Sequence, residues 1–371
     1  MELRELGDVL VADGPFVTVL VESESAVEKP ADKYDLVWKD VSRALIEQGV
    51  DGATVDAVMG AKGTHDEGEA RLVVASTDDH EVRLAMSLRH PPRQPIVDVA
   101  PLPHLLPLVD ELGQRVPYVL VRCDRAGATV EAWRNLGDQA ARVEGDVESG
   151  WGPDPRGPSA WQHTAHQHRL EQGWIGDIAQ DIVRTISRLA HQVKPELVIG
   201  VGDQRELHAI EEHLPADLKG KWTTVPGGRG EDGSEPLVRQ RVNDLLHLHL
   251  ALKELDLLDK YAEERGQLDR GCDGIAETVE ALRKAQVDTL LIPTWSPFHG
   301  SLWFGPEPTQ IGISPEELAD IGAPMPSSGP IVDVLLRAAI GTGADVRHVA
   351  HELDQAPHGG AGALLRYADR R

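Results

Sequence analysis

The sequence has little cysteine, and what it has is not arranged for disulfide bonding. The 371 residues include two cysteines, Cys123 and Cys272, which lie far apart and form no CxxC pair. Two cysteines are too few for the disulfide framework of a small secreted protein. We therefore expect a protein of the reducing cytoplasm.

Long apolar runs and a secretory leader are also lacking. Met1 is followed by Glu2, Arg4 and Glu5 rather than by a basic stretch and an apolar core, and no run approaches the roughly 18 apolar residues of a membrane span. The sequence predicts neither secretion nor insertion, and no membrane partner.

Positive charge is scarce. The formal charge is 37 basic minus 61 acidic residues, or −24. Loose, sequence-independent binding to nucleic acid relies on neutralising phosphates, so this balance argues against a DNA partner and restricts any RNA contact to a local patch. Taken alone, the charge indicates only a very soluble cytosolic protein. With 41% hydrophobic residues, the chain is long enough for two or three separately cored domains.

Several familiar catalytic motifs are missing. No GxSxG, HExxH or GxxxxGK[ST] occurs. Gly200 and Gly202 begin a G-x-G, but Arg205 stands where a dinucleotide fold has its third glycine, so a tight turn is the better interpretation. We expect no cofactor.

Three histidines, His163, His166 and His168, invite a metal hypothesis. On a regular helix residues 163 and 166 share a face, whereas residue 168 points roughly 140° away from residue 163. Three-point ligation from this segment is awkward, so we expect no metal and predict a polar helix surface that partly faces RNA.

The pattern of apolar residues predicts alternating strands and helices. Strands are expected at 16–21, 71–75, 81–88, 116–122, 128–133, 197–201, 289–292 and 345–350. Helices are expected at 31–48, ended by Gly49, and at 160–191, 206–214, 238–264, 274–285 and 331–342. Residues 51–69 are expected to form a helical turn followed by an exposed loop. Irregular structure is also expected in the proline-rich segment 91–107, in the loop 148–159, and in an insertion at 293–330.

This order predicts an α/β protein of three domains with mixed sheets. We place an N-terminal domain at residues 1–115, a middle domain at 116–242 and a C-terminal domain at 243–371.

The order of landmarks resembles the archaeo-eukaryotic peptide-chain release factors and Pelota across essentially the whole chain. A hairpin opening a middle domain, a strand with a glycine turn and a helix, a helix and strand of a last domain, and a closing glycine turn with its strand follow one another as in that family. These landmarks are Val116–Trp133, Leu197–Leu214 (LVIGVGDQRELHAIEEHL), Gly271–Pro293 (GCDGIAETVEALRKAQVDTLLIP) and Gly343–Tyr367 (GADVRHVAHELDQAPHGGAGALLRY). The resemblance implies three domains arranged as in a release factor or Pelota.

One loop departs from the release-factor pattern. Release factors carry Gly-Gly-Gln before a Ser-Ala start to the long helix, and the glutamine helps to position water against the ester of peptidyl-tRNA. Here the stretch reads Arg156, Gly157, Pro158, Ser159, Ala160. Proline has neither an amide side chain nor a backbone N–H, so no catalytic residue is expected.

Such degenerate loops resemble those of the actinobacterial Balon-type ribosome hibernation factors. The resemblance implies a non-enzymatic factor that fills the vacant A site of the 70S ribosome, contacts 16S and 23S rRNA there, and has elongation factor Tu as a further partner. Two alternatives stay open: a Pelota-like rescue factor that recruits a splitting ATPase, and a peptidyl-tRNA or RNA hydrolase whose water is positioned by Gln162 or the histidines.

On the decoding side, the resemblance directs attention to four residues of the 51–69 segment. Their cation, hydroxyl and imidazole suit rRNA phosphates, sugars and stacked bases. These residues are Lys62, Gly63, Thr64 and His65. The alternative is an ordinary connection, which the neighbouring acidic residues favour.

In the middle-domain loop, a guanidinium and two indoles can stack on exposed bases or on a protein partner. The alternative is that Trp161 packs into its own helix. The predicted rRNA contacts of this loop are Trp151, Arg156, Gly157, Pro158, Ser159, Trp161, Gln162 and His163.

Overall fold

The computed structural model forms two compact units. It describes residues 6–11, 14–23, 30–124, 127–135, 138–146, 179–228, 235–267, 270–294, 300–323 and 325–368. One unit combines Met1–Gln114 with Glu254–Arg371, and the other is Arg115–Lys253, so the second division falls within the long helix α8 (Glu235–Gly266). The fold is mixed α/β with several sheets, as the sequence predicted. The division into three domains stays a prediction.

The N-terminal part of the first unit is an antiparallel sheet of order β3-β2-β1-β4. Its strands are β1 (Phe16–Glu22), β2 (Ala70–Ser76), β3 (Val82–Leu88) and β4 (Ile96–Ala100). The first three confirm the predicted strands at 16–21, 71–75 and 81–88. β4 was missed because the prolines around it indicated irregular structure, but β4 lies at the sheet edge, where proline is tolerated.

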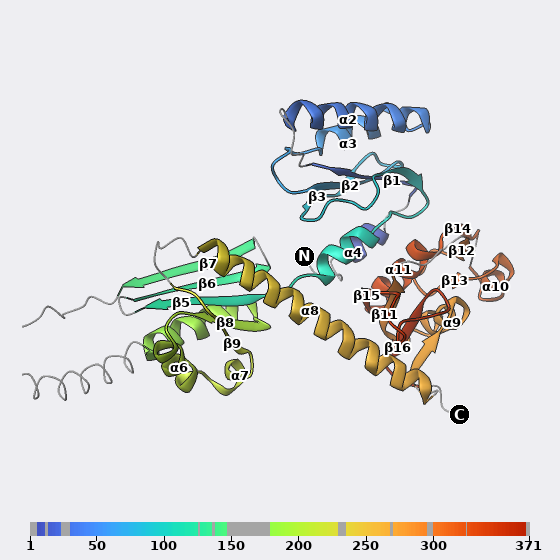
Figure 1. The fold of residues 1–371 in the computed structure, drawn as a ribbon. Coiled ribbons are helices and arrows are strands. Elements are labelled where there is room, and N and C mark those ends of the chain that lie inside the picture. Colours follow the sequence, from blue (N-terminus) through green and yellow to red (C-terminus); the bar gives the residue numbers. More distant parts are fainter. Residues whose placement is uncertain are drawn as a thin grey trace, which may run out of the picture. The chain divides into compact units, whose positions relative to one another are not determined.

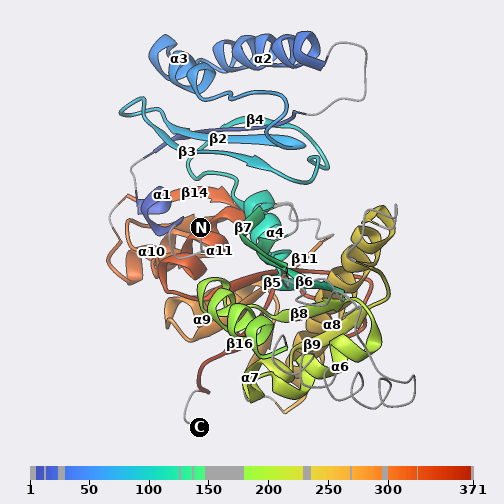
Figure 2. The same ribbon diagram turned by 90° about the vertical axis from the view of Figure 1, so that its left-hand side faces the viewer.

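Two helices, α2 (Pro30–Glu47) and α3 (Gly52–Gly60), cover one face of this sheet (Figures 1 and 2). Tyr34, Trp38 and Leu45 of α2 are buried at helical spacing and pack in one cluster with Val19 and Val73 of the sheet. α2 ends before Gly49, which has a φ of +84°, as predicted. From Phe16 to Val21 the strand β1 is apolar except for Thr18, in keeping with the burial of both of its faces.

The C-terminal part of the first unit contains a mixed sheet of order β10-β16-β11-β15. Its strands are β10 (Gly271–Asp273), β11 (Val287–Pro293), β15 (Asp345–Val349) and β16 (Gly362–Leu365), and its helices are α9 (Ile275–Arg283) and α11 (Ile331–Gly341). The two helices pack on one face, and Leu258 and Tyr261 near the end of α8 pack on the other. The predicted helices and strands of this region are confirmed.

The proline- and glycine-rich insertion before α11 is more regular than expected. It forms a small sheet of order β13-β12-β14, built from β12 (Ser301–Phe304), β13 (Ile311–Gly312) and β14 (Ser327–Pro330), together with the short helix α10 (Pro315–Asp320). Arg337 of α11 is 7% exposed and donates hydrogen bonds to the backbone carbonyls of Pro306 and Glu307. This guanidinium therefore ties the insertion to α11.

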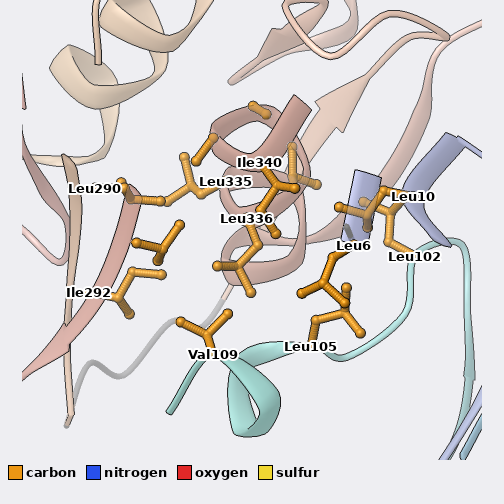
Figure 3. Close-up of a cluster of buried hydrophobic side chains, with 14 of the residues drawn as sticks. Leu6, Leu10, Leu102, Leu105, Val109, Leu290, Ile292, Leu335, Leu336 and Ile340 are labelled. Carbon is orange, nitrogen blue, oxygen red and sulfur yellow. The ribbon is translucent and has the colours of Figure 1, made fainter. Parts of the chain in front are cut away.

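Two further short helices join the core of the first unit. Leu10 of α1 (Gly7–Val11) and Val109 of α4 (Leu106–Gly113) lie with Leu336 of α11 in one buried cluster, which also contains Leu6 and Leu105, the residues directly before the two helices (Figure 3). No helix was predicted at α4, whose first two residues fall in the proline-rich segment 91–107 that was predicted to be irregular. Pro107 instead occupies the first turn of the helix, where no N–H is needed.

The second unit has a five-stranded sheet of order β7-β6-β5-β8-β9. Its strands are β5 (Tyr118–Asp124), β6 (Gly127–Asn135), β7 (Asp138–Asp146), β8 (Leu197–Val201) and β9 (Trp222–Val225). The helical residues 179–193 and α6 (Gln204–His213) pack on one face, and the first part of α8 packs on the other. The short helix α7 (Ala216–Lys219) precedes β9. The predicted strand–turn–helix at β8 and α6 is confirmed, and β7 and β9 were missed.

Two compositional expectations bear on this fold. Both cysteines are buried free thiols. Within the described ranges, no helix has the length and apolarity needed to cross a bilayer, and no group of three or more His, Cys, Asp or Glu side chains is placed to hold a metal ion.

Candidate functional site

The predicted decoding-side contacts lie in residues 61–69, the loop between α3 and β2. Arg71 of β2 makes hydrogen bonds to this loop. The Arg71 side chain is 12% exposed. Its Nε and Nη2 donate to the carbonyl of Ala61 at 3.0 and 2.7 Å, and its Nη1 lies 3.1 Å from Ser87 Oγ and 3.3 Å from Glu67 Oε2. One guanidinium thus fixes both ends of the loop, as its planar array of donors permits.

The cation of this loop has a partner within the protein. Lys62 Nζ lies 2.8 Å from Asp35 Oδ1 on α2, and the Tyr34 hydroxyl donates to the Lys62 carbonyl. The hydrogen bond from Lys62 and its charge hold the pKa of Asp35 below its usual value. Both side chains of the ion pair remain partly exposed, so Lys62 can exchange Asp35 for an external anion at little cost.

Gly63 is required by the geometry of the loop. Its φ is +68°, and a Cβ there would lie 2.8 Å from Glu67 Oε2 and 3.0 Å from the guanidinium carbon of Arg71. The next residue, Thr64, is exposed and donates to Glu67 Oε1 at 3.1 Å, while His65 is half-buried. The four predicted residues therefore form one ordered turn.

The electrostatics of the segment limit what this turn can bind. Residues 51–69 contain five acidic residues and one basic residue, Lys62, for a formal charge of +1 − 5 = −4. Such a surface does not attract phosphates generally, so an RNA contact here must be made by the hydroxyl, the imidazole and one cation at short range.

A polar cluster not predicted from the sequence lies at the start of α3. The Asp51 carboxylate caps α3 by accepting from the backbone N–H groups of Ala53 and Thr54 at 2.9 and 3.0 Å. Thr54 Oγ1 lies 2.7 Å from Asp51 Oδ2 and 2.8 Å from His80 Nδ1. Thr54 and His80 resemble a nucleophile and its base. However, Thr54 is fully buried, and its hydroxyl is hydrogen-bonded to Asp51, the residue that caps α3.

The turn that contains His80 could be predicted from the sequence, but the contact of His80 with α3 could not. It has a φ of +61° in the turn between β2 and β3, a conformation that histidine adopts more readily than most residues. The polar turn was visible in the sequence as STDDH, residues 76–80. Its contact with α3 was not, because 26 residues separate His80 from Thr54.

The second predicted set of contacts, in the middle-domain loop, lies outside the described residues. This set comprises Trp151, Arg156, Gly157, Pro158, Ser159, Trp161, Gln162 and His163. The described chain approaches it through β7, which ends at Asp146, and continues with the helical residues from 179 onward. The prediction for this loop stays a prediction.

Curated relatives of the whole chain exist in Mycobacterium tuberculosis. The uncharacterized protein Rv2629 of strain H37Rv is 23% identical over 391 aligned residues, which span 99% of this chain and 97% of the relative. The uncharacterized protein MT2704 of strain CDC 1551 matches with the same figures.

Solved structures with a distant likeness include two archaeal Pelota proteins. Pelota of Archaeoglobus fulgidus is 15% identical with a TM-score of 0.32, over 69% of this chain and 66% of that chain. The match to a model of ribosome-bound archaeal Pelota and ABCE1 has 12% identity and a TM-score of 0.40, over 100% and 95% of the two chains. These values describe a weak overall superposition.

A family model provides the decisive comparison. Residues 117–267, which run from β5 to the end of α8, match the model described as bacterial archaeo-eukaryotic release factor family 2. The matched stretch contains the whole five-stranded sheet of the second unit. This match lies in the middle part of the chain and supports the resemblance to the archaeo-eukaryotic release factors that the sequence predicted.

Proposed function

We propose that this protein is a ribosome-binding factor that fills the vacant A site and blocks it sterically, without cleaving peptidyl-tRNA. The observation that carries the proposal is Pro158, which stands within the family-matched region where release factors carry the glutamine of Gly-Gly-Gln. Since proline has no amide side chain and no backbone N–H, it cannot position a hydrolytic water as that glutamine does. The chain would keep the family's reach and lose its chemistry.

The decoding-side loop supports the same proposal. Arg71 holds residues 61–69 in one conformation, which leaves Thr64 exposed and Lys62 in an exchangeable surface ion pair. A preformed turn loses less conformational entropy on binding than a mobile loop does. In the proposed complex this turn contacts 16S rRNA, and the loop around Arg156 and Trp161 contacts 23S rRNA.

The acidic surface shapes the proposed mode of binding. A charge of −24 opposes general attraction to rRNA, so productive binding depends on shape and on the few local contacts. Delivery by a protein partner would overcome this repulsion, and elongation factor Tu is the partner that we propose. The role would then be hibernation: an occupied A site excludes aminoacyl-tRNA and protects idle ribosomes.

Co-sedimentation with purified bacterial 70S ribosomes tests the proposal. We expect the protein to pellet with vacant ribosomes at physiological salt and to be rejected by ribosomes whose A site already holds tRNA. The triple variant Lys62→Ala/Thr64→Ala/His65→Ala tests the predicted contact. Its control is Lys39→Ala, at an exposed position of α2. Equal retention with and without A-site tRNA would contradict the proposal.

A release assay tests the chemical half of the proposal. The natural protein should leave peptidyl-tRNA intact in stalled ribosomes, because Pro158 supplies no water-positioning group. The variant Arg156→Gly/Pro158→Gln restores Gly-Gly-Gln with Gly157 in place. Release by this variant alone would support the proposed position of the loop, whereas turnover by the natural protein would favour a hydrolase. Subunit splitting in the presence of an ATPase would instead favour a rescue factor.

A further inference from the structure

Residues 101–113, which follow β4 and include α4, pack against two parts of the first unit. We call β1–β4 with α2 and α3 the N-terminal module, and residues 270–368 the C-terminal module. Leu102, Leu105 and Leu108 are buried in the same cluster as Leu335 of α11 and Leu20 of β1. The segment therefore packs in one apolar cluster with both modules. Figure 3 draws the part of this cluster that includes Leu102, Leu105 and Val109 of the segment with Leu335 and Leu336 of α11.

One histidine of this segment has polar contacts to both modules. The backbone N–H of His104 donates to Thr18 Oγ1 of β1 at 3.2 Å. Its ring Nε2 lies 2.9 Å from Asp98 Oδ2 of β4, and its ring Nδ1 lies 2.7 Å from Asp333 Oδ2 of α11. Asp333 is 229 residues away in the sequence and only 4% exposed.

The geometry favours the charged form of the ring. Both ring nitrogens lie within hydrogen-bond distance of a carboxylate oxygen, and only the imidazolium has N–H groups on both nitrogens. We propose that the His104 imidazolium, shared by Asp98 and Asp333, fastens the N-terminal module to the C-terminal module, and that loss of its proton loosens the two.

The surrounding charges agree with this assignment. Burial lowers the pKa of His104, but hydrogen bonds and attraction from Asp333 and then Asp98 outweigh it and raise the pKa to about 9. Burial also raises the pKa of Asp333, and His104 opposes that rise. The shared proton resides on the imidazole, because Asp98 stabilises the charged ring from its other side. The third packed element, β1, contributes the neutral Thr18.

The direction of the pH dependence follows. A histidine whose pKa is raised by folding contributes stability that is complete below its ordinary pKa of 6.5 and lost as the pH rises through about 9. The contact of the His104 imidazolium with Asp98 and Asp333 therefore holds the two modules together at neutral pH and is lost at alkaline pH. Removing His104 at neutral pH has the same effect, since it leaves the buried Asp333 carboxylate without its counter-charge.

A second histidine provides an internal control. His348 Nδ1 of β15 contacts Asp110 Oδ1 of α4, so this pair ties the connecting segment to the C-terminal module without touching the N-terminal sheet. The variant Asp110→Asn should leave the contacts of β1 and β4 with His104 intact. This variant separates the loss of the His104 contact with Asp98 and Asp333 from a general loosening of residues 101–113.

Hydrogen exchange on the full chain, read from pH 7 to pH 10 and corrected for intrinsic rates, tests the proposal. In the natural protein we expect protection of the residue 102–108 amides and of β4 to fall at least about tenfold with an inflection near pH 9. His104→Leu should show the low protection already at pH 7, with no inflection. Asp110→Asn should keep the inflection.

Two further measurements keep the test decisive. The double variant His104→Leu/Asp333→Leu replaces the buried charges with apolar groups, so it should regain most of the protection at pH 7 while lacking the alkaline inflection. The ring resonances of His104 in NMR should titrate well above the ordinary value. Titration near 6.5, or an unchanged pH profile in His104→Leu, would overturn the proposal.

Discussion

The first unit contains two clusters of charged side chains that differ mainly in burial. In the decoding-side loop, Lys62 and Asp35 are 38% and 58% exposed at the side chain, and water can replace either partner. In the His104 cluster the side chains of His104 and Asp333 are 20% and 4% exposed, and each group depends on the other. Similar residue types therefore have a small role in stability at one site and a large one at the other.

The largest expected effect comes from breaking the buried cluster. Asp333→Ala removes the carboxylate that accepts from His104 Nδ1 and leaves a protonated or desolvated ring behind. We expect a loss of about 3 kcal/mol in the free energy of unfolding of the first unit, measured by urea denaturation at pH 7. A loss below about 1 kcal/mol would place this cluster with the exposed pairs.

Raising the pH should reproduce that loss without a mutation. A pKa of about 9 in the folded protein against an ordinary 6.5 corresponds to about 3 kcal/mol, present at pH 6 and removed by pH 10. Urea denaturation at successive pH values would measure it. In Asp333→Ala this alkaline component should shrink, because the variant has already lost the first cause of the raised pKa.

An intermediate loss of stability is expected for Arg71, whose side chain is mostly buried but whose partner Glu67 is exposed. Arg71→Ala removes two hydrogen bonds to the Ala61 carbonyl and the contact with Ser87, so we expect a loss of about 2 kcal/mol. Arg71→Lys should recover only part of it, because an ammonium cannot span both ends of the loop. Full recovery by lysine would show that charge alone matters here.

Gly63 separates backbone strain from crowding. Gly63→Ala places a residue at a φ of +68° and a Cβ 2.8 Å from Glu67, for which we expect a loss of about 1–2 kcal/mol. The matched control is Gly49→Ala, with a φ of +84° and no atom within 4 Å of the added Cβ. The difference between the two variants in thermal or urea unfolding measures the crowding by Glu67 and Arg71.

The smallest effect belongs to Lys62. Lys62→Ala should change the free energy of unfolding by no more than about 0.5 kcal/mol, since its ion pair with Asp35 is exposed to water. If ribosome binding nevertheless falls, the cation serves binding rather than stability. A stability loss as large as that of Asp333→Ala would remove the distinction between the two clusters.

The sequence by itself determined most local elements and the family resemblance. Helical spacing placed α2 and α11, apolar runs placed β1 and β11, and the family resemblance was confirmed by the match to residues 117–267. These features depend on residues close together in the chain, where periodicity and turn chemistry are visible.

Only the tertiary structure decided where the prolines and the charges act. β4 and α4 were missed because Pro95 and Pro107 suggest irregular chain, yet an edge strand and a first helical turn both accept proline. His104 gave no signal in the sequence, because its counter-charge Asp333 is 229 residues away. The identity of a charged residue is local, but the burial that gives it its energy is set by the whole fold.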